Sequence, residues 1–114
     1  MKEISVEELK INPSTLIVKE WALLTAGNKD GYNTMTVSWG QMGELWNKPT
    51  TVVYIRPQRY TKEFVDKSEY YTLSFLPDGH REALSYLGSH SGRDEDKLAK
   101  TDLTGAATDD YAYI

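Results

Sequence analysis

The chain has 114 residues, of which 39% are hydrophobic and 26% are charged, a balance typical of one globular domain and too apolar for a disordered chain. The formal net charge of −4 argues against general nucleic-acid binding, which needs a basic surface to neutralise phosphates. Because the chain has no cysteine and only two histidines, disulfides, iron–sulfur clusters, thiolate nucleophiles, cysteine zinc sites and three-histidine metal centres are excluded.

The amino-terminal segment has no apolar signal stretch, and no later segment reaches transmembrane length. A cytoplasmic protein without a membrane partner is therefore predicted. Residues 5–10 are predicted to form a short helical turn, because Ser5 can cap it and Glu8 stands three residues further on. Pro13 is expected to end this turn.

Two strands joined by a tight loop are predicted next, over residues 16–25 and 32–39. Residues 27–31, with the sequence GNKDG, tolerate the positive φ angles of a hairpin loop. In the second strand apolar residues alternate with threonine and serine, the period of a strand with one buried face. The apolar members of that strand are expected to lie in the core: Met35, Val37 and Trp39.

The remaining elements alternate between strand and helix, which predicts a mostly β, barrel-like fold with short helices. Four antiparallel strands and a stub at residues 111–114 would leave an open sheet edge, unless another chain covers it. Val53, Leu73 and Phe75 are expected in the core. In chain order the predicted elements are a loop over residues 40–49, a strand over residues 50–55, a helix over residues 61–67 that buries Phe64 and Val65, a strand over residues 70–76, a helix from a cap at Asp78 to a stop at Gly88, and a short helix over residues 91–100.

The first segment suited to binding chemistry is residues 33–40, NTMTVSWG. Its row of hydroxyl groups offers hydrogen-bond donors and acceptors along one strand face. Trp39 offers a flat apolar surface beside Gly40, which allows another ring or backbone to approach closely. The alternative interpretation is an ordinary sheet face in water, where threonine is a common strand former.

The second segment, residues 56–61, joins a strand end to a helix start. Thr61 can cap that helix, and the free amides there form an anion site together with Arg56 or Arg59. The alternative is a solvated turn that carries two surface arginines. Neither interpretation is excluded by this segment alone.

The third segment, residues 89–97, combines serine hydroxyls, a glycine and a new helix start. Arg93 and Lys97 stand one helical turn apart, which suits a phosphate group. The same pattern is equally typical of a capped helix with surface ion pairs. His90 is interpreted as a structural or surface histidine rather than a general base.

Taken together, these segments resemble the flavin reductase-like (flavoredoxin) family, the split barrels that bind flavin mononucleotide (FMN). Residues 33–40, 45–49, 56–61 and 89–97 follow the family pattern in order and with fitting gaps, and the resemblance covers the chain to about residue 104. It implies a six- or seven-stranded split barrel, usually a homodimer with FMN between the subunits. It also implies either an oxidoreductase that reduces flavin with a nicotinamide dinucleotide, NAD(P)H, or an electron-transfer protein with a redox partner.

The resemblance also implies which residues hold the flavin. Asn33 and Trp39 are expected to contact it directly, and the second and third segments to hold its phosphate and ribityl end. No residue receives a catalytic or metal-binding role, because the chemistry belongs to the flavin. The expected cofactor-binding residues are Asn33, Thr34, Met35, Thr36, Ser38, Trp39, Arg56, Gln58, Arg59, Thr61, Ser89, Ser91, Arg93 and Lys97.

The carboxyl-terminal end departs from the family pattern. Family members continue with further strands that complete the barrel and its dimer surface, whereas residues 101–110 here are mostly small and polar and are followed by YAYI. Residues 1–114 are therefore predicted to form a single flavin reductase-like domain that lacks the family's last strands, an incomplete split barrel. A second function stays open: a flavin-free shortened homologue that acts as an oligomerising or interaction module.

Overall fold

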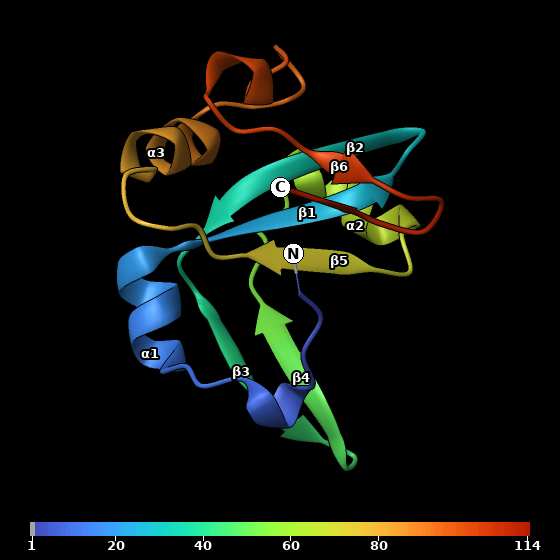
Figure 1. Ribbon diagram of the computed structural model, residues 1–114. Helices are drawn as coiled ribbons and strands as arrows, with labels where there is room; N and C mark the ends of the chain where they lie inside the picture. Colours follow the sequence, from blue (N-terminus) through green and yellow to red (C-terminus); the bar gives the residue numbers. More distant parts are fainter. Residues whose placement is uncertain (1) are drawn as a thin grey trace.

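The computed structural model describes residues 2–114 and is built on a three-stranded antiparallel sheet (Figure 1). The strand order is β2-β1-β5, so β1 is central and β2 is an edge strand. The other four strands form two separate hairpins, β3–β4 and β6–β7. Figure 1 shows the β3–β4 hairpin projecting away from the three-stranded sheet. The strands are β1 (Ala22–Asn28), β2 (Gly31–Val37), β3 (Gly40–Leu45), β4 (Lys48–Val53), β5 (Tyr71–Ser74), β6 (Ala106–Ala107) and β7 (Ala112–Tyr113).

Short helices connect and cover the strands. Within residues 2–114 no helix is long and apolar enough to cross a membrane. The helical elements are η1 (Val6–Glu8), α1 (Pro13–Thr15), η2 (Leu16–Glu20), α2 (Thr61–Lys67), α3 (Arg81–Ser89) and η3 (Leu98–Lys100).

The core has two apolar clusters, because successive residues of β1 point to opposite faces of the sheet. On one face Leu24 packs with Met35, and Val65 of α2 covers them. On the other face Leu23 packs with Leu84 and Leu87 of α3. The buried hydroxyl groups between β1 and β2 are paired, since Thr25 donates to Thr34 Oγ1 at 3.0 Å and Thr34 donates to the Leu24 carbonyl at 3.1 Å. Because α2 covers one face of the sheet and α3 covers the other, these two helices hold β2 between them.

The predicted mostly β fold with antiparallel strands is confirmed, and several elements match closely. The helix over residues 61–67 forms as predicted, with Phe64 and Val65 half-buried. Of the expected core, Met35 and Val37 are buried, while Val53, Leu73 and Phe75 are half-buried against the same cluster. The prediction that Trp39 lies in the core is wrong, because β2 ends at Val37 and Trp39 is 58% exposed.

The prediction of one strand over residues 16–25 is wrong in its first half. Asn12 accepts a hydrogen bond from the Ser14 amide at 3.0 Å, and Pro13 occupies the first position of α1. Proline fits there because its missing N–H would have no intrahelical partner. The chain then stays helical through Glu20, and the strand begins only after Trp21, whose φ of 66° breaks the helix. Pro13 therefore starts a helix instead of ending one.

The prediction of a loop over residues 40–49 is also wrong, since this segment forms most of the β3–β4 hairpin. The two turn residues, Trp46 and Asn47, have φ angles of 54° and 61°. Two successive positive φ angles match the twist of a tight hairpin, but tryptophan rarely adopts them. The sequence therefore lacked the usual turn signal.

The helix boundaries after residue 77 differ from the predictions as well. α3 begins at Arg81 with His80 at its N-cap, so Asp78 is not the cap, and Gly88 lies inside the helix. Of residues 91–100 only Leu98–Lys100 is helical. The stub at residues 111–114 is a strand, as predicted, but it pairs with β6 in a small hairpin that was not predicted.

Candidate functional site

The candidate site is organised around a hydrogen bond between β2 and α2. The Asn33 side chain is 91% buried and donates from Nδ2 to Thr61 Oγ1 at 2.7 Å. Thr61 was predicted to cap α2, but Tyr60 is at the N-cap and the fully buried Thr61 hydroxyl accepts from Asn33 instead. Gly92 packs on the same amide so closely that a Cβ there would collide with Asn33 Oδ1. The β2 strand, the start of α2 and the 92–98 loop therefore meet at Asn33.

Lys97 is a buried cation whose ammonium group lies at the carboxyl-terminal end of α3. Its side chain is 3% exposed, and Nζ donates to the carbonyls of Leu87 at 2.9 Å and His90 at 3.0 Å. A cation is favourable there because the last carbonyls of a helix carry partial negative charge. Burial, with a contribution from the charge of Arg59, lowers the pKa of Lys97 to about 8, against a raising effect of Glu95.

Arg59 is a second cation, and it lines the same small cavity as Lys97. Its Nη1 donates to the Gly88 carbonyl at 2.9 Å, whereas its Nη2 is buried with no hydrogen-bond partner among the described residues. Burial, and then the charge of Arg56, lowers the pKa of Arg59. A buried N–H without an acceptor is costly. An oxyanion beside Arg59 would therefore complete the hydrogen bonding of this group.

A small cavity of about 120 Å³ lies between these two cations. We call it the anion cavity, because it combines Arg59 and Lys97 with hydroxyl groups from three different segments. The His90 ring stacks on Tyr86 with the ring centroids 3.7 Å apart. The anion cavity is lined by Asn33, Gln58, Arg59, Tyr60, Thr61, Ser89, His90, Ser91 and Lys97.

A second cavity of about 280 Å³ follows the carboxyl-terminal half of β2. This strand cavity shares Gln58 and Arg59 with the anion cavity, so the two adjoin. Its outer wall carries Trp39, whose ring lies 5.2 Å from the Arg56 guanidinium carbon. The strand cavity is lined by Met35, Thr36, Val37, Ser38, Trp39, Tyr54, Arg56, Gln58 and Arg59.

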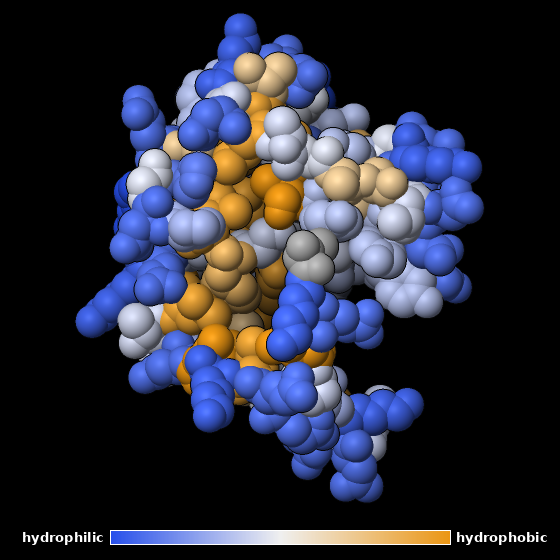
Figure 2. Space-filling model, viewed as in Figure 1, coloured by the Kyte–Doolittle hydropathy of each residue, from blue (hydrophilic) through white to orange (hydrophobic). Residues whose placement is uncertain are grey.

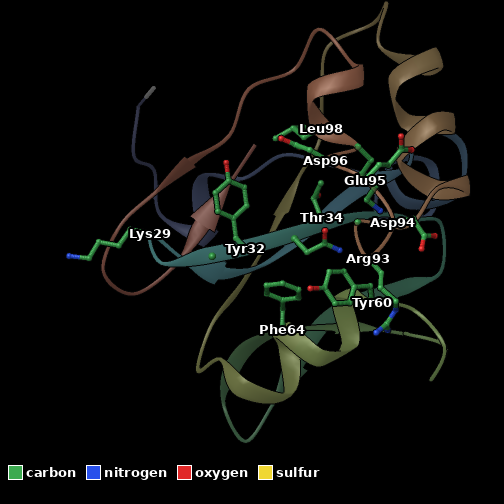
Figure 3. Close-up of a pocket in the computed structure, with 14 residues that line it drawn as sticks. Lys29, Tyr32, Thr34, Tyr60, Phe64, Arg93, Asp94, Glu95, Asp96 and Leu98 are labelled. Carbon is green, nitrogen blue, oxygen red and sulfur yellow. The ribbon is translucent and has the colours of Figure 1, made fainter.

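A third cavity of about 640 Å³ lies over the amino-terminal half of β2, between α2 and the 92–98 loop (Figure 3). This edge cavity shares Asn33 and Lys97 with the anion cavity. Thr34 and Arg93 line it, and they are the two expected site residues that line neither of the other cavities. Arg93 forms an ion pair with Glu63 at 2.7 Å and is more than half exposed.

All the other expected site residues line the anion cavity or the strand cavity. Sequence reasoning missed Tyr54, whose hydroxyl accepts from Gln41 Nε2 at 3.0 Å across the β3–β4 hairpin. The available signal was the period-two spacing of Tyr54 and Arg56, which places both on one side of an extended segment. Among residues 2–114 no group of three side chains is arranged to hold a metal ion.

Solved structures with the same fold include flavoredoxin of Desulfovibrio vulgaris (Miyazaki F), with a TM-score of 0.73 and 23% identity, covering 99% of this chain and 60% of that chain. An FMN-binding domain of a flavin reductases-like enzyme from Shewanella baltica OS155 has a TM-score of 0.70 and 19% identity, covering 88% of this chain and 54% of that chain. Flavoredoxin from Methanosarcina acetivorans has a TM-score of 0.68 and 25% identity, covering 91% of this chain and 55% of that chain. The chain thus spans less than two thirds of the length of these structures.

These likenesses confirm the predicted mostly β fold of the flavin reductase-like split-barrel type. Comparison with curated protein sequences gave no significant match. Residues 16–112 match the family described as "Flavin reductase like domain", which covers most of the sequence. The chain therefore belongs to the flavin reductase like domain family.

Proposed function

We propose that this chain is an FMN-binding flavoprotein that acts as a flavin reductase-like oxidoreductase or as an electron-transfer domain. The observation that carries the proposal is the anion cavity, where the half-buried Arg59 and the buried Lys97 adjoin a cavity along β2. Family membership and neighbours that are described as FMN-binding support it.

The anion cavity has the groups that a phosphate dianion requires. In a chain with a net charge of −4, a phosphate needs a local concentration of cations. Arg59 Nη2 lacks an acceptor, and the Thr61 oxygen already accepts from Asn33, which leaves the Thr61 hydroxyl proton free to be donated. A charge-assisted hydrogen bond is worth roughly 1.5–3 kcal/mol. The cations and this hydroxyl would therefore hold the phosphate.

The strand cavity suits the flavin ring. Because β2 is an edge strand, alternate residues turn their backbone N–H and C=O groups away from β1, where they can pair with the polar edge of a ring system. Trp39 provides a flat apolar surface on the outer wall. Met35, Thr36 and Ser38 also line this cavity.

When bound, FMN supplies hydride and single-electron transfer, and the residues of the chain bind and orient it. We infer that electrons come from a nicotinamide dinucleotide or a redox partner protein, as the family pattern implies. Trp39 and Tyr54 at the rim of the strand cavity are 58% and 51% exposed. A second copy of the chain that covers them would exclude water from the ring, so we also infer a homodimer.

Titration with FMN and with riboflavin, which lacks the phosphate, tests this proposal. Arg59→Ala is expected to weaken FMN binding about ten- to a hundredfold, through the loss of one charge-assisted bond, and to leave riboflavin binding nearly unchanged. Lys62→Ala is the matched control, because Lys62 pairs with Asp66 on the surface of α2 and lines none of the three cavities. Trp39→Ala is expected to weaken both flavins.

Two results would count against the proposal. Equal losses for FMN and riboflavin in Arg59→Ala would show that the phosphate does not bind in the anion cavity. A wild-type chain that binds neither flavin would favour the alternative function, a flavin-free interaction module.

A further inference from the structure

Tyr86 of α3 makes a hydrogen bond that has no role in the proposed binding of FMN. Its hydroxyl donates to Glu95 Oε1 at 2.6 Å, and the Glu95 side chain points toward α3 in Figure 3. This bond raises the pKa of Tyr86 above its ordinary value, so the hydroxyl keeps its proton in neutral and mildly alkaline solution. The bond ties the 92–98 loop, which also carries Lys97, to α3.

The ring of Tyr86 lies near the helix end that Lys97 binds. It stacks on the His90 ring, with the centroids 3.7 Å apart and the ring planes at 14°. The His90 carbonyl in turn accepts from Lys97 Nζ at 3.0 Å. Tyr86 therefore contacts both the loop that carries Lys97 and the residue that accepts its hydrogen bond.

The ammonium group of Lys97 has one N–H left for a ligand. Such a group carries three donors, and among the described residues two carbonyls accept from it. Lys97 forms no ion pair with a carboxylate of the described residues, although Glu95 stands two positions before it. A direct pair with Glu95 would occupy the third N–H and offset the charge that a phosphate needs. Because Glu95 Oε1 accepts from Tyr86 instead, that N–H stays available.

The charge of Glu95 acts on Lys97 even without a direct pair. Burial, and then the charge of Arg59, lowers the pKa of Lys97 to about 8, and the charge of Glu95 opposes this lowering. Without that carboxylate the ammonium group would lose its proton at a lower pH. Glu95 thus helps to keep Lys97 charged.

The other charged groups around Lys97 do not replace Glu95. Asp94 and Asp96 on the same loop are exposed, so water screens their charges. Two cations that line a cavity together with Lys97 are engaged in surface ion pairs, Arg93 with Glu63 at 2.7 Å and Lys29 with Asp109 at 2.6 Å. The remaining titratable side chains that line a cavity with Lys97 are Tyr32, Arg59, Tyr60 and His90.

We propose that Tyr86 and Glu95 are positioning residues of the anion cavity: the Tyr86 hydroxyl holds the Glu95 carboxylate away from Lys97, and the carboxylate keeps the ammonium group charged for an oxyanion. The proposal rests on the flavin site proposed above, because FMN supplies that oxyanion as its phosphate. Neither residue lines the anion cavity or the strand cavity, so both act through Lys97.

Tyr86→Phe tests the first half of the proposal, because it keeps the ring that stacks on His90 and removes only the hydroxyl. The freed Glu95 carboxylate then pairs with Lys97 and competes with the phosphate. FMN binding at neutral pH should weaken about tenfold, while riboflavin binding stays unchanged. Adding Glu95→Gln to this variant removes the competitor and should restore FMN binding.

Tyr70→Phe is the matched control, because Tyr70 is 53% exposed and lines none of the three cavities. An equal loss for both flavins in Tyr86→Phe would show a merely structural role for the hydroxyl. That result, or a loss of FMN binding that Glu95→Gln does not restore, overturns the proposal.

The pH profile of FMN binding tests the second half. In the wild-type chain the affinity should fall as the pH rises through about 8, by up to about tenfold per pH unit, because the free Lys97 loses its proton. Glu95→Gln can still accept from Tyr86 but carries no charge, so its fall should begin at a lower pH. Glu82→Gln, an exposed position on α3 that lines none of the three cavities, should keep the wild-type profile. Identical profiles for the wild-type chain and Glu95→Gln overturn the proposal.

An NMR titration of Lys97 in the flavin-free chain separates this proposal from the proposed function. The wild-type signal should titrate near pH 8, that of Glu95→Gln at a lower pH, and that of Tyr86→Phe at a higher pH. If FMN binds but the three midpoints coincide, the positioning roles are overturned and the proposed function stands. If neither flavin binds, the proposed function fails. Midpoints that move in these two directions then uphold the positioning of Lys97, and coinciding midpoints overturn it.

Discussion

The anion cavity and the β3–β4 hairpin differ in how far a single chain completes them. At the anion cavity Asn33 and Lys97 are buried with partners for their donors, and Arg59 Nη2 is the exception. On the hairpin Leu45 and Trp46 are 53% and 85% exposed. Figure 2 shows hydrophobic residues at the surface between the central sheet and this hairpin. The cavity thus has one buried donor that a small anion would satisfy, whereas the hairpin exposes apolar side chains that a partner would cover.

Replacing the buried cation is expected to have the largest effect. Lys97→Met leaves the carbonyls of Leu87 and His90 without their donor, so the free energy of unfolding should fall by about 2–4 kcal/mol. Lys100→Met is the control on an exposed lysine and should change it by less than about 0.5 kcal/mol. Urea denaturation measures both variants. Equal stability of the two would mean that the Lys97 hydrogen bonds contribute nothing.

The pH dependence of stability provides a second test of this cation. The pKa of Lys97 is about 8 in the folded chain and 10.5 as the ordinary value. Between these values the unfolded chain binds more protons, so the free energy of unfolding should rise with pH from about 8 to 10. The slope is at most about 1.4 kcal/mol per pH unit. Denaturation of Lys97→Met, which has no such group, should lack this rise; a parallel rise in both chains would contradict the assignment.

The sequence predicted the elements whose signals are local. The alternation of Met35 and Val37 indicated their strand, and the segment after Arg59 indicated the α2 helix. The grouping of the site residues came from the family resemblance, and the structure brings most of them to two adjoining cavities. The binding roles of these residues stay a prediction until ligands are titrated.

What the sequence could not reveal depends on long-range packing or on unusual backbone angles. Threonine is a common helix-capping residue, but the Thr61 hydroxyl accepts a hydrogen bond from Asn33, which is 28 residues away in the chain. The burial of Lys97 depends on the carbonyls that end α3, which no local pattern indicates. Trp21 and Trp46 adopt positive φ angles that sequence patterns assign to glycine or asparagine.

Self-association tests the hairpin half of the comparison. The pairing of Gln41 with Val52 places Val52 on the same face as Leu45. The double change Leu45→Glu and Val52→Glu is expected to weaken dimer formation at least tenfold, about 1.4 kcal/mol, through loss of apolar contact and added like charges. Sedimentation over a range of concentrations measures this. A wild-type chain that stays monomeric at micromolar concentration would refute the homodimer. Thr50→Glu is the control for charge alone, because it adds one charge to the same hairpin face outside the apolar pair.

The smallest expected effect concerns the hairpin turn within a single copy. Trp46 is 85% exposed at a φ of 54°, a conformation that is costly for a bulky side chain and that asparagine tolerates. In the background of the Leu45→Glu and Val52→Glu changes, where association does not contribute, Trp46→Asn should raise the free energy of unfolding by about 0.5 kcal/mol. Trp39→Asn is the control on an exposed tryptophan without a positive φ and should give no gain. Because urea denaturation resolves midpoints better than extrapolated energies, the midpoints are compared. A lower midpoint for Trp46→Asn would show that the ring of Trp46 contributes contacts within one copy that outweigh the cost of its backbone conformation.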